Sequence, residues 1–418
     1  MNRTFLTILF SLSLAIFSAC SDDDKAPWQE LPTGPITGAD AMLTFNGDRS
    51  YGTLTVDAHD AQNGSITLSN VIPGYPEVIM DVALDEQPDG SFTLKGTKKL
   101  NTPPAMLPDS RADATAAIYD LTAEGTVSPD GKAAVAVTSA LTTKAEGRLA
   151  GTWVPARLLP LAPDAMSEAP VVVSMTGTGN PAETDKISST LSLILGNLVY
   201  QTIKSVSFNP DGNVTATFTR EADLLKMMTE GIDKTTGTYS PVAGTWETSG
   251  KNLIFWYCAG DMLMLTPYVP NILDQIMIDN GQNPNENDGA MAEIEKIFIG
   301  KLTAAGVDTN ALITLFAKIN KTGFPIVVAE NPSGISLMLT KDMLDPIVNP
   351  LLPALTALDA KLDAMIAANP DDKTLAMITQ ELFPQLNIAH LSDLAGLWNN
   401  ADDITITLNL IASSPKQI

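Results

Sequence analysis

The tripeptide Pro-Asp-Gly occurs at residues 88–90, 129–131 and 210–212, each time between two short runs of alternating apolar and polar residues. Proline presets the first dihedral angle of a turn, aspartate bonds to the turn backbone, and glycine accepts a positive φ. Each tripeptide therefore predicts a hairpin between two antiparallel strands. A calcium loop is the alternative, but Ca²⁺ needs more acidic ligands than the one that each turn offers.

Short predicted strands fill the chain from residue 41 to about residue 145. Residues 51–56 (Tyr-Gly-Thr-Leu-Thr-Val) alternate between two faces. The same pattern continues in the runs 65–71, 78–84, 91–94, 117–127 and 133–141. Strands at this spacing, separated by Gly, Pro, Asn and Asp, are typical of an antiparallel sandwich or barrel. We therefore predict an N-terminal antiparallel β domain over residues 41–146.

Several prolines interrupt the alternation near residue 147, and from there we expect a second β domain over residues 147–418 with a helical insertion at about 261–392. Apolar spacing predicts helices over 187–198, 294–302, 308–323, 349–370 and 371–383, the third capped by Asp308 and ended by Gly323. Alternation predicts late strands over 324–328, 334–339 and 404–411. Residues 280–289 are expected to form a solvated loop. The run 253–258 is apolar on both faces and must be covered on both. The fold class is thus mainly β with inserted helices (α+β).

The first twenty residues have the pattern of a secretory signal: one positive charge at Arg3, an apolar stretch over 5–17, and small residues before Cys20. The stretch is too short to span a bilayer as a helix. A cysteine directly after small residues resembles a bacterial lipoprotein signal over residues 1–20, which implies that Cys20 carries the lipid. Phe17 departs from that pattern, where leucine is usual. Ordinary cleavage with a chance cysteine is the alternative.

Residues 21–40 begin with Ser21 and three aspartates and continue with prolines and glycines, as expected for a flexible acidic tether. The aspartates repel anionic headgroups, so they do not hold the chain against a membrane surface. The stretch is similar to the acidic surface-export tag of Bacteroides-type lipoproteins. That similarity implies an outer-membrane location with the protein displayed on the cell surface. A periplasmic-facing location is the alternative.

Gly-x-Trp occurs three times, ending at Trp153, Trp246 and Trp398. A tryptophan near the start of a barrel's first strand can close one end, and glycine permits close approach of the chain there. The motif resembles the opening of lipocalin-like (calycin) domains. With Cys20 and the acidic stretch, the chain resembles calycin-like surface lipoproteins of unknown function. The resemblance implies two antiparallel calycin-like β-barrel or sandwich units and brings no catalytic residue.

The charge and the rarity of histidine restrict the chemistry. A net charge of -23 argues against nucleic acid as a partner, because phosphate contacts need Lys or Arg. His59 and His390 are the only histidines, and the chain has no His-Glu-x-x-His, Cys-x-x-Cys, P-loop or Gly-x-Gly-x-x-Gly motif. No catalytic residue, metal or cofactor is predicted. We expect Cys258, inside an apolar run, to be a buried small hydrophobe.

Aromatic side chains are the candidate ligand contacts: Trp153, Trp246, Trp256, Tyr257 and Trp398, with Met227, Met228, Met262 and Met264 beside them. Plain core packing is the alternative for this set. The sequence predicts non-catalytic binding of a small apolar ligand or a cell-surface partner by a protein that lipidated Cys20 holds to the outer membrane. Two alternatives are a structural or interaction subunit of an outer-membrane assembly and a metal-independent carboxylate hydrolase acting on glycans.

Overall fold

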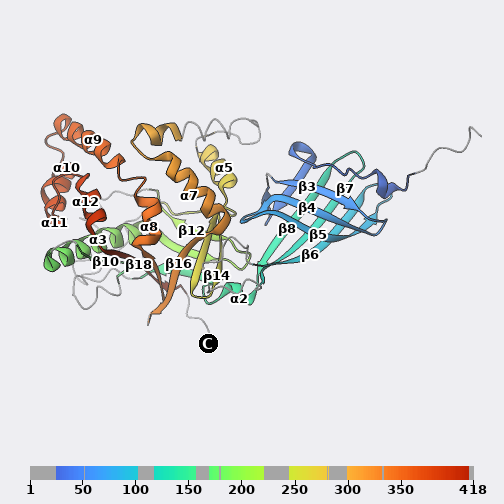
Figure 1. The fold of residues 1–418 in the computed structure, drawn as a ribbon, viewed down its shortest axis with the longest axis horizontal. Helices are drawn as coiled ribbons and strands as arrows, with labels where there is room; N and C mark the ends of the chain where they lie inside the picture. The colour runs from blue at the N-terminus through green and yellow to red at the C-terminus, as the bar shows by residue number, and fades with distance from the viewer. Residues whose placement is uncertain are drawn as a thin grey trace, which may run out of the picture. The chain divides into compact units, whose positions relative to one another are not determined.

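The computed structural model describes residues 25–50, 52–101, 117–156, 169–177, 180–220, 244–279, 281, 299–331 and 334–413 (Figure 1). The predicted signal with Cys20, the aspartates of the predicted tether, Tyr51, Met227 and Met228 lie outside these residues. So do nearly all of the expected loop at 280–289 and most of the expected helix at 294–302.

The chain divides into two compact units, and each has its own sheet. The first contains the residues up to Ile72, Pro76–Lys98 and Thr122–Thr138. The second contains Pro73–Tyr75, Lys99–Leu121 and the residues from Ser139 onward. The structure is therefore mainly β, with two curled sheets and helices.

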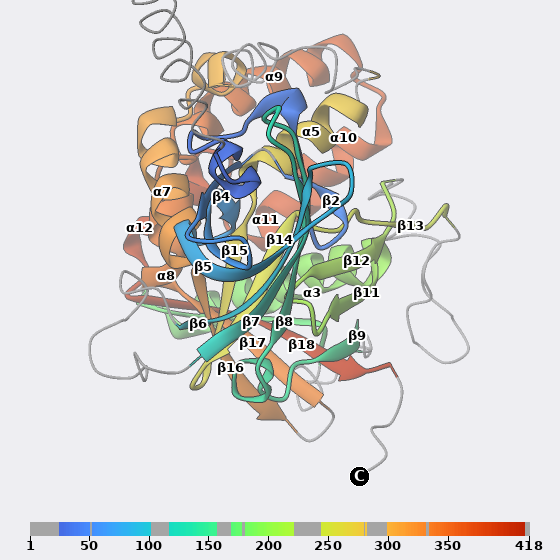
Figure 2. The ribbon, with the colours of Figure 1, turned by 90° about the vertical axis from the view of Figure 1, so that its right-hand side faces the viewer.

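Eight described strands form the first sheet, in the order β2-β1-β8-β7-β6-β5-β4-β3. Figure 2 labels β2 and β4 to β8 among them. Two short 3₁₀ turns, η1 (Pro27–Glu30) and η2 (Gly38–Asp40), precede them. The strands are β1 (Ala41–Phe45), β2 (Asp48–Arg49), β3 (Thr53–Ala58), β4 (Asn63–Ile72), β5 (Tyr75–Glu86), β6 (Phe92–Asn101), β7 (Ala117–Val127) and β8 (Ala133–Leu141). Alternation along β8 buries every second residue from Ala133 to Leu141, while the residues between them are more exposed, as a sheet with one covered face requires.

The predicted hairpins are confirmed at all three Pro-Asp-Gly sites. The tripeptides connect β5 with β6, β7 with β8, and β11 (Ile203–Phe208) with β12 (Val214–Phe218). Gly90, Gly131 and Gly212 have φ angles of 80°, 87° and 87°. Glycine adopts this left-handed conformation without the steric penalty that a side chain brings, which explains its place in each turn.

One strand pair departs from the antiparallel prediction, because β1 runs parallel to β8. The same stretch of chain also reaches the other end of the sheet order, where Ile36 and Leu54 of β3 exchange backbone hydrogen bonds of 2.7 and 3.2 Å. Residues 36–45 are therefore bonded both to β3 and to β8. This stretch joins the two ends of the curled sheet and protects backbone groups that an open edge exposes.

Ten strands form the second sheet, in the order β13-β12-β11-β9-β18-β17-β16-β15-β14, with β10 paired to β18. Besides β11 and β12 they are β9 (Gly151–Pro155), β10 (Val171–Thr176), β13 (Glu247–Thr248), β14 (Ile254–Ala259), β15 (Met262–Pro267), β16 (Phe324–Asn331), β17 (Gly334–Thr340) and β18 (Asp403–Ala412). On one side β18 pairs with β17, and on the other it pairs with β9 and β10 in turn. The predicted strands at 253–258, 324–328, 334–339 and 404–411 are confirmed.

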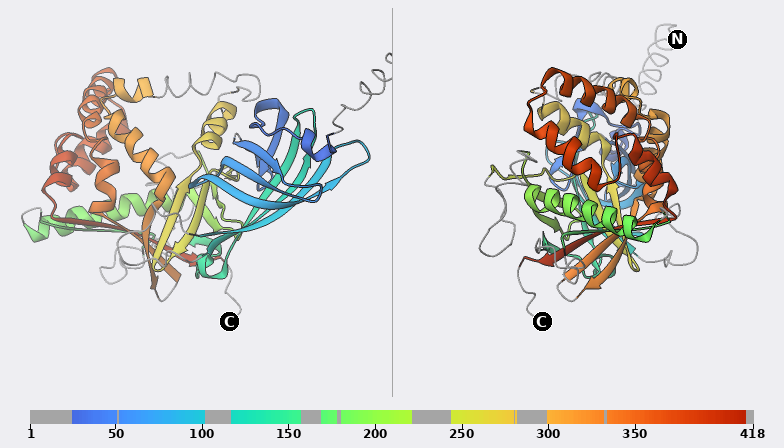
Figure 3. Two further views of the ribbon diagram at one scale, coloured as in Figure 1. Left: turned by 45° about the vertical axis from the view of Figure 1, so that its right-hand side comes forward. Right: turned by 90° about the vertical axis from the view of Figure 1, so that its left-hand side faces the viewer.

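The helices of the second unit gather beside its sheet (Figure 3). They are α2 (Thr143–Glu146), α3 (Pro181–Thr202), α5 (Val269–Asp279), α7 (Thr309–Thr322), α8 (Lys341–Val348), α9 (Ala354–Ala368), α10 (Lys373–Met377), a π-helical turn (Ile378–Leu382), α11 (Phe383–Gln385) and α12 (Asp393–Asn400). Helix α3 packs on β10, and α8 packs on β17 and β18.

The helix predictions have three outcomes. The helix over 187–198 is confirmed as α3, and α7 begins after Asp308, whose side chain accepts the Ala311 amide, and ends before Gly323. The predicted start at Asn349-Pro350 is wrong, because α9 begins at Ala354, and α8, which directly precedes that pair, was not predicted. The segment 371–383 is helical in α10 and the π-helical turn that follows it.

Candidate functional site

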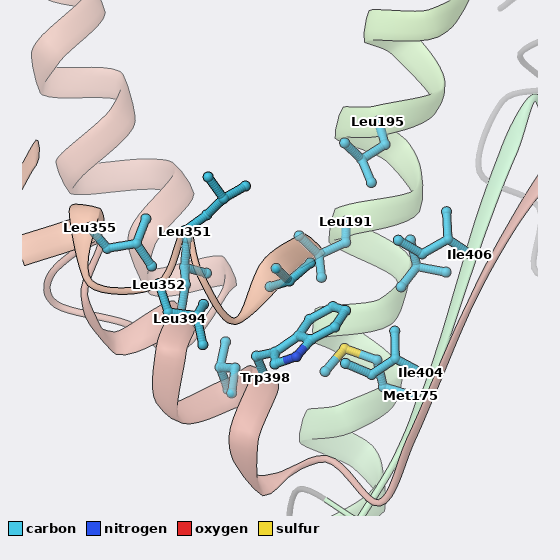
Figure 4. A pocket seen from close by; sticks show the side chains of 13 residues that line it. Met175, Leu191, Leu195, Leu351, Leu352, Leu355, Leu394, Trp398, Ile404 and Ile406 are labelled. Carbon is cyan, nitrogen blue, oxygen red and sulfur yellow. The ribbon is translucent and has the colours of Figure 1, made fainter. Parts of the chain in front are cut away.

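The second unit holds an apolar cavity of about 290 Å³ (Figure 4). Its lining comes from α3, β10, β18, α12 and the chain that runs from the end of α8 to the start of α9. The lining residues are Val173, Met175, Leu191, Leu195, Val348, Leu351, Leu352, Leu355, Leu394, Leu397, Trp398, Ile404 and Ile406. All of these side chains are aliphatic, thioether or aromatic, and the indole N–H of Trp398 is their single polar group.

Helix α3 supplies one wall because its start and its sheet contact are both fixed. Asn180 caps it by accepting the Ala182 amide at 3.1 Å, and Pro181 occupies the first helical position. Ser192 Oγ accepts the Val173 amide of β10 at 2.8 Å, so it bonds the helix to the strand edge. Leu191 and Leu195 then stand beside the cavity, as Figure 4 shows.

The connection between α8 and α9 supplies the opposite wall. In Figure 4 Leu351, Leu352 and Leu355 lie across the cavity from Leu191 and Leu195. Leu351 lines the cavity although 39% of its surface is exposed. Its position therefore marks where the cavity meets the surface of the unit.

Two aspartates fix the start of α12, which carries Leu394, Leu397 and Trp398. Asp359 of α9 accepts the Leu391 and Ser392 amides at 2.6 and 3.0 Å. Burial alone raises the pKa of Asp359, but hydrogen bonds from the Ser392 side chain and the two amides outweigh it, so the pKa is lowered. Asp393 accepts the Ala389 and His390 amides, and these bonds lower its pKa.

A third aspartate, Asp345 of α8, binds the Trp398 side chain. The indole Nε1 of Trp398 donates to Asp345 Oδ1 at 2.8 Å. Lys341, one turn earlier on α8, places its Nζ 3.4 Å from each Asp345 oxygen and 5.9 Å from the centroid of the indole ring. The carboxylate meets the N–H edge of the indole, while the ammonium lies over the ring, which is the arrangement of a cation–π contact.

The five aromatic side chains predicted as ligand contacts do not meet at one place. Trp398 lines the apolar cavity. Trp153 of β9 and Trp256 of β14 are buried and donate their indole N–H groups to the carbonyls of Leu149 and Asn209. Tyr257 is buried beside Trp256, and Trp246 is half-buried with Lys204 over its ring. Met262 and Met264 lie in β15, away from the cavity lining.

The Gly-x-Trp motifs also differ in structure. Gly151-Thr152-Trp153 opens β9, residues 244–246 precede β13, and Gly396-Leu397-Trp398 lies inside α12. The third motif is therefore helical and does not open a strand. Because a three-residue match specifies no backbone conformation, the α-helical spacing of Leu394, Leu397 and Trp398 is the signal that identifies α12.

The remaining titratable candidates lie outside the cavity. Cys258 of β14 is largely covered, its Sγ lies 3.7 Å from the Glu146 carbonyl, and burial raises the pKa of its thiol to about 12. His59 is exposed near Asp57 in the first unit, and His390 precedes α12 in the second. In the part of the chain that the structure describes, no three His, Cys, Asp or Glu side chains are grouped to hold a metal ion.

Two further findings concern the chain as a whole. Among the described residues, no helix is both long enough and apolar enough to cross a membrane. Protein-family models, curated proteins and solved structures were compared with the chain, and none of them matches it. The resemblance to calycin-like lipoproteins therefore stays a prediction.

Proposed function

We propose that the chain is a lipid-anchored, extracytoplasmic binding protein whose second unit takes up a small apolar ligand in the apolar cavity. The lining of that cavity is the observation that carries the proposal. Its volume of about 290 Å³ is close to the lower end of ordinary ligand pockets, roughly 300–1,000 Å³. An engineered apolar cavity of about 150 Å³ already binds benzene.

An apolar occupant is favoured over water in this cavity. The one polar group of the lining, Trp398 Nε1, is bonded to Asp345, so the lining offers water no further hydrogen-bond partner. Each CH₂ group that leaves water for such an apolar site gains about 0.8 kcal/mol. The lining has no carboxylate, imidazole or thiol to act as acid, base or nucleophile, which favours binding over catalysis.

The ligand is expected to present a hydrocarbon chain or ring to the cavity. The one polar group of the lining, Trp398 Nε1, already donates to Asp345, so an ionised or strongly polar group finds no partner inside. A polar end, if the ligand has one, stays outside, beyond the rim at Leu351.

A titration with α-methylstyrene, followed through methionine methyl groups labelled with ¹³C, tests the proposal. The Met175 methyl signal, assigned by its loss in Met175→Leu, is expected to shift in a saturable way because Met175 lines the cavity. The signal of Met264, which is buried in β15 outside the lining, is expected to stay in place. An unchanged Met175 signal contradicts the proposal.

Two variants of α3 make the matched comparison. Leu195→Trp fills the cavity and is expected to abolish the Met175 shift. Leu198→Trp introduces the same side chain three residues away, where the leucine is 36% exposed and does not line the cavity, and it is expected to leave the shift intact. Equal binding by the two variants contradicts the site.

The lipid anchor has a separate test. Cys20→Ala, expressed in the protein's own host, is expected to release the protein in soluble form. Continued membrane association of this variant contradicts the anchor without affecting the cavity.

A further inference from the structure

Trp398 gives the apolar cavity a potential hydrogen-bond donor among twelve side chains that have none. An indole N–H without an acceptor can bond to an oxygen or nitrogen atom of a ligand. Whether the cavity binds ligands that carry a hydrogen-bond acceptor therefore depends on which group already accepts the Trp398 N–H.

Asp345, which does not line the cavity, accepts the Trp398 N–H. The 2.8 Å bond from Nε1 to Asp345 Oδ1 is charge-assisted, and such bonds are stronger than those between neutral groups. Asp345 is itself placed by Lys341, and both side chains are mostly covered, with 29% and 19% of their surface exposed. The Lys341 ammonium lies above the indole ring and the Asp345 carboxylate lies at the N–H edge of the ring. Both contacts favour the same orientation of the indole.

We infer that Asp345 is a positioning residue that sets the ligand specificity of the cavity: by holding the Trp398 N–H, it makes the cavity select hydrocarbon over groups that carry a hydrogen-bond acceptor. This inference rests on the proposed function. A site whose polar groups are already satisfied gains nothing from an acceptor on the ligand and leaves that acceptor desolvated.

A pair of nearly isosteric probes measures this selectivity. Acetophenone differs from α-methylstyrene by a C=O group in place of C=CH₂. The ratio of their affinities, taken from the Met175 methyl shift, measures how much one acceptor oxygen on the ligand raises or lowers binding. The protein is expected to prefer α-methylstyrene. Asp345→Ala frees the N–H to donate to the ketone oxygen, so the preference is expected to fall by about fivefold, the effect of one neutral hydrogen bond.

A double-mutant cycle shows whether Asp345 acts through the indole. Trp398→Phe has no N–H, so it is expected to keep the preference for α-methylstyrene, and adding Asp345→Ala to it is expected to change the ratio no further. Asp345→Asn retains an oxygen that accepts the N–H and is expected to keep a ratio near that of the unaltered protein. A merely structural role for Asp345 predicts instead that its removal has the same effect in both backgrounds.

The indole N–H is also followed without any probe. In ¹⁵N spectra of the ligand-free protein, the signal that disappears in Trp398→Phe belongs to Trp398, and it is expected to move upfield in Asp345→Ala and little in Asp345→Asn. An unmoved signal in Asp345→Ala, or an unchanged affinity ratio, overturns the inference while the proposed function stands. A Met175 signal that neither probe shifts overturns the proposed function instead.

Discussion

Gly212 ends the third Pro-Asp-Gly turn, and it differs from its two counterparts in what surrounds it. A Cβ atom on Gly212 meets Tyr119 Cε1 at 2.8 Å and the Tyr119 hydroxyl at 3.2 Å, whereas one on Gly90 or Gly131 meets nothing within 4 Å. Backbone bonds fix this turn from two directions: the Leu141 amide donates to Pro210 O and the Trp256 amide to Gly212 O, each at 2.8 Å. Substitution of Gly212 by alanine therefore tests how rigidly this turn is packed against Tyr119.

The expected magnitude has two parts. A positive φ costs an alanine about 1–2 kcal/mol at either Gly131 or Gly212, because both have φ 87°. Only Gly212→Ala adds overpacking against Tyr119, about 1–3 kcal/mol. Tyr119 cannot easily move, since it is buried and its hydroxyl donates to Trp256 O at 3.2 Å.

Urea unfolding read by hydrogen exchange and mass spectrometry gives a midpoint for each unit. With a slope of about 3 kcal/mol/M, the extra 1–3 kcal/mol lowers the midpoint of the second unit by a further 0.3–1 M or so. Gly260→Ala is the control in the same unit, because Gly260 also has a positive φ, 62°, and open space around it. In a Tyr119→Leu background the excess is expected to vanish. Equal losses in Gly212→Ala and Gly260→Ala refute the reasoning.

Two further predictions concern titratable groups. With the pKa of Cys258 at about 12, its thiolate is about a thousandfold scarcer near neutral pH than that of an ordinary thiol. Iodoacetamide is therefore expected to label the Cys258 peptide slowly in the folded protein and rapidly in urea. Equal labelling rates in the two conditions contradict this prediction. The pKa values of Asp359 and Asp393 are lowered in the folded state, so their stabilisation is complete above the ordinary carboxyl pKa of about 4 and is lost as the pH falls through the lowered values. Exchange protection of the amides of residues 389–392 is expected to decrease in that acid range, and Asp359→Asn is expected to lack the part of this change that falls on residues 391 and 392.

Local signals predicted the elements whose ends are determined by nearby residues. Asp308 and Gly323 marked both ends of α7 because a cap acts within one turn of the helix. Phe255, Trp256 and Tyr257 are all buried in β14, as the run with two apolar faces indicated. Alternation likewise located β7, β8 and β18, since a strand with one covered face repeats every two residues.

Tertiary packing decided the places where prediction failed. Helix α8 contains Pro346, whose missing N–H argues against a helix, but the helix packs on β17 and β18 and tolerates the loss. The pair Asn349-Pro350 has the residues of a helix start, yet Pro353 lies closer to the actual start at Ala354. The apolar cavity was beyond prediction because its lining extends from Val173 to Ile406 over five separate parts of the chain.

The central place of β18 has a consequence for how the second unit assembles. It follows all the other described strands of its sheet in chain order, yet β9, β10 and β17 all pair with it. Asn409 of β18 bonds to Ala156 and Pro170 at the junction of β9 and β10. During synthesis these earlier strands must wait for residues 403–412 before their pairing is complete, so the unit closes late and over long sequence separations. A chain cut before Asp403 leaves β9, β10 and β17 each without the strand that pairs with one of its edges, and β10 is the strand on which α3 packs.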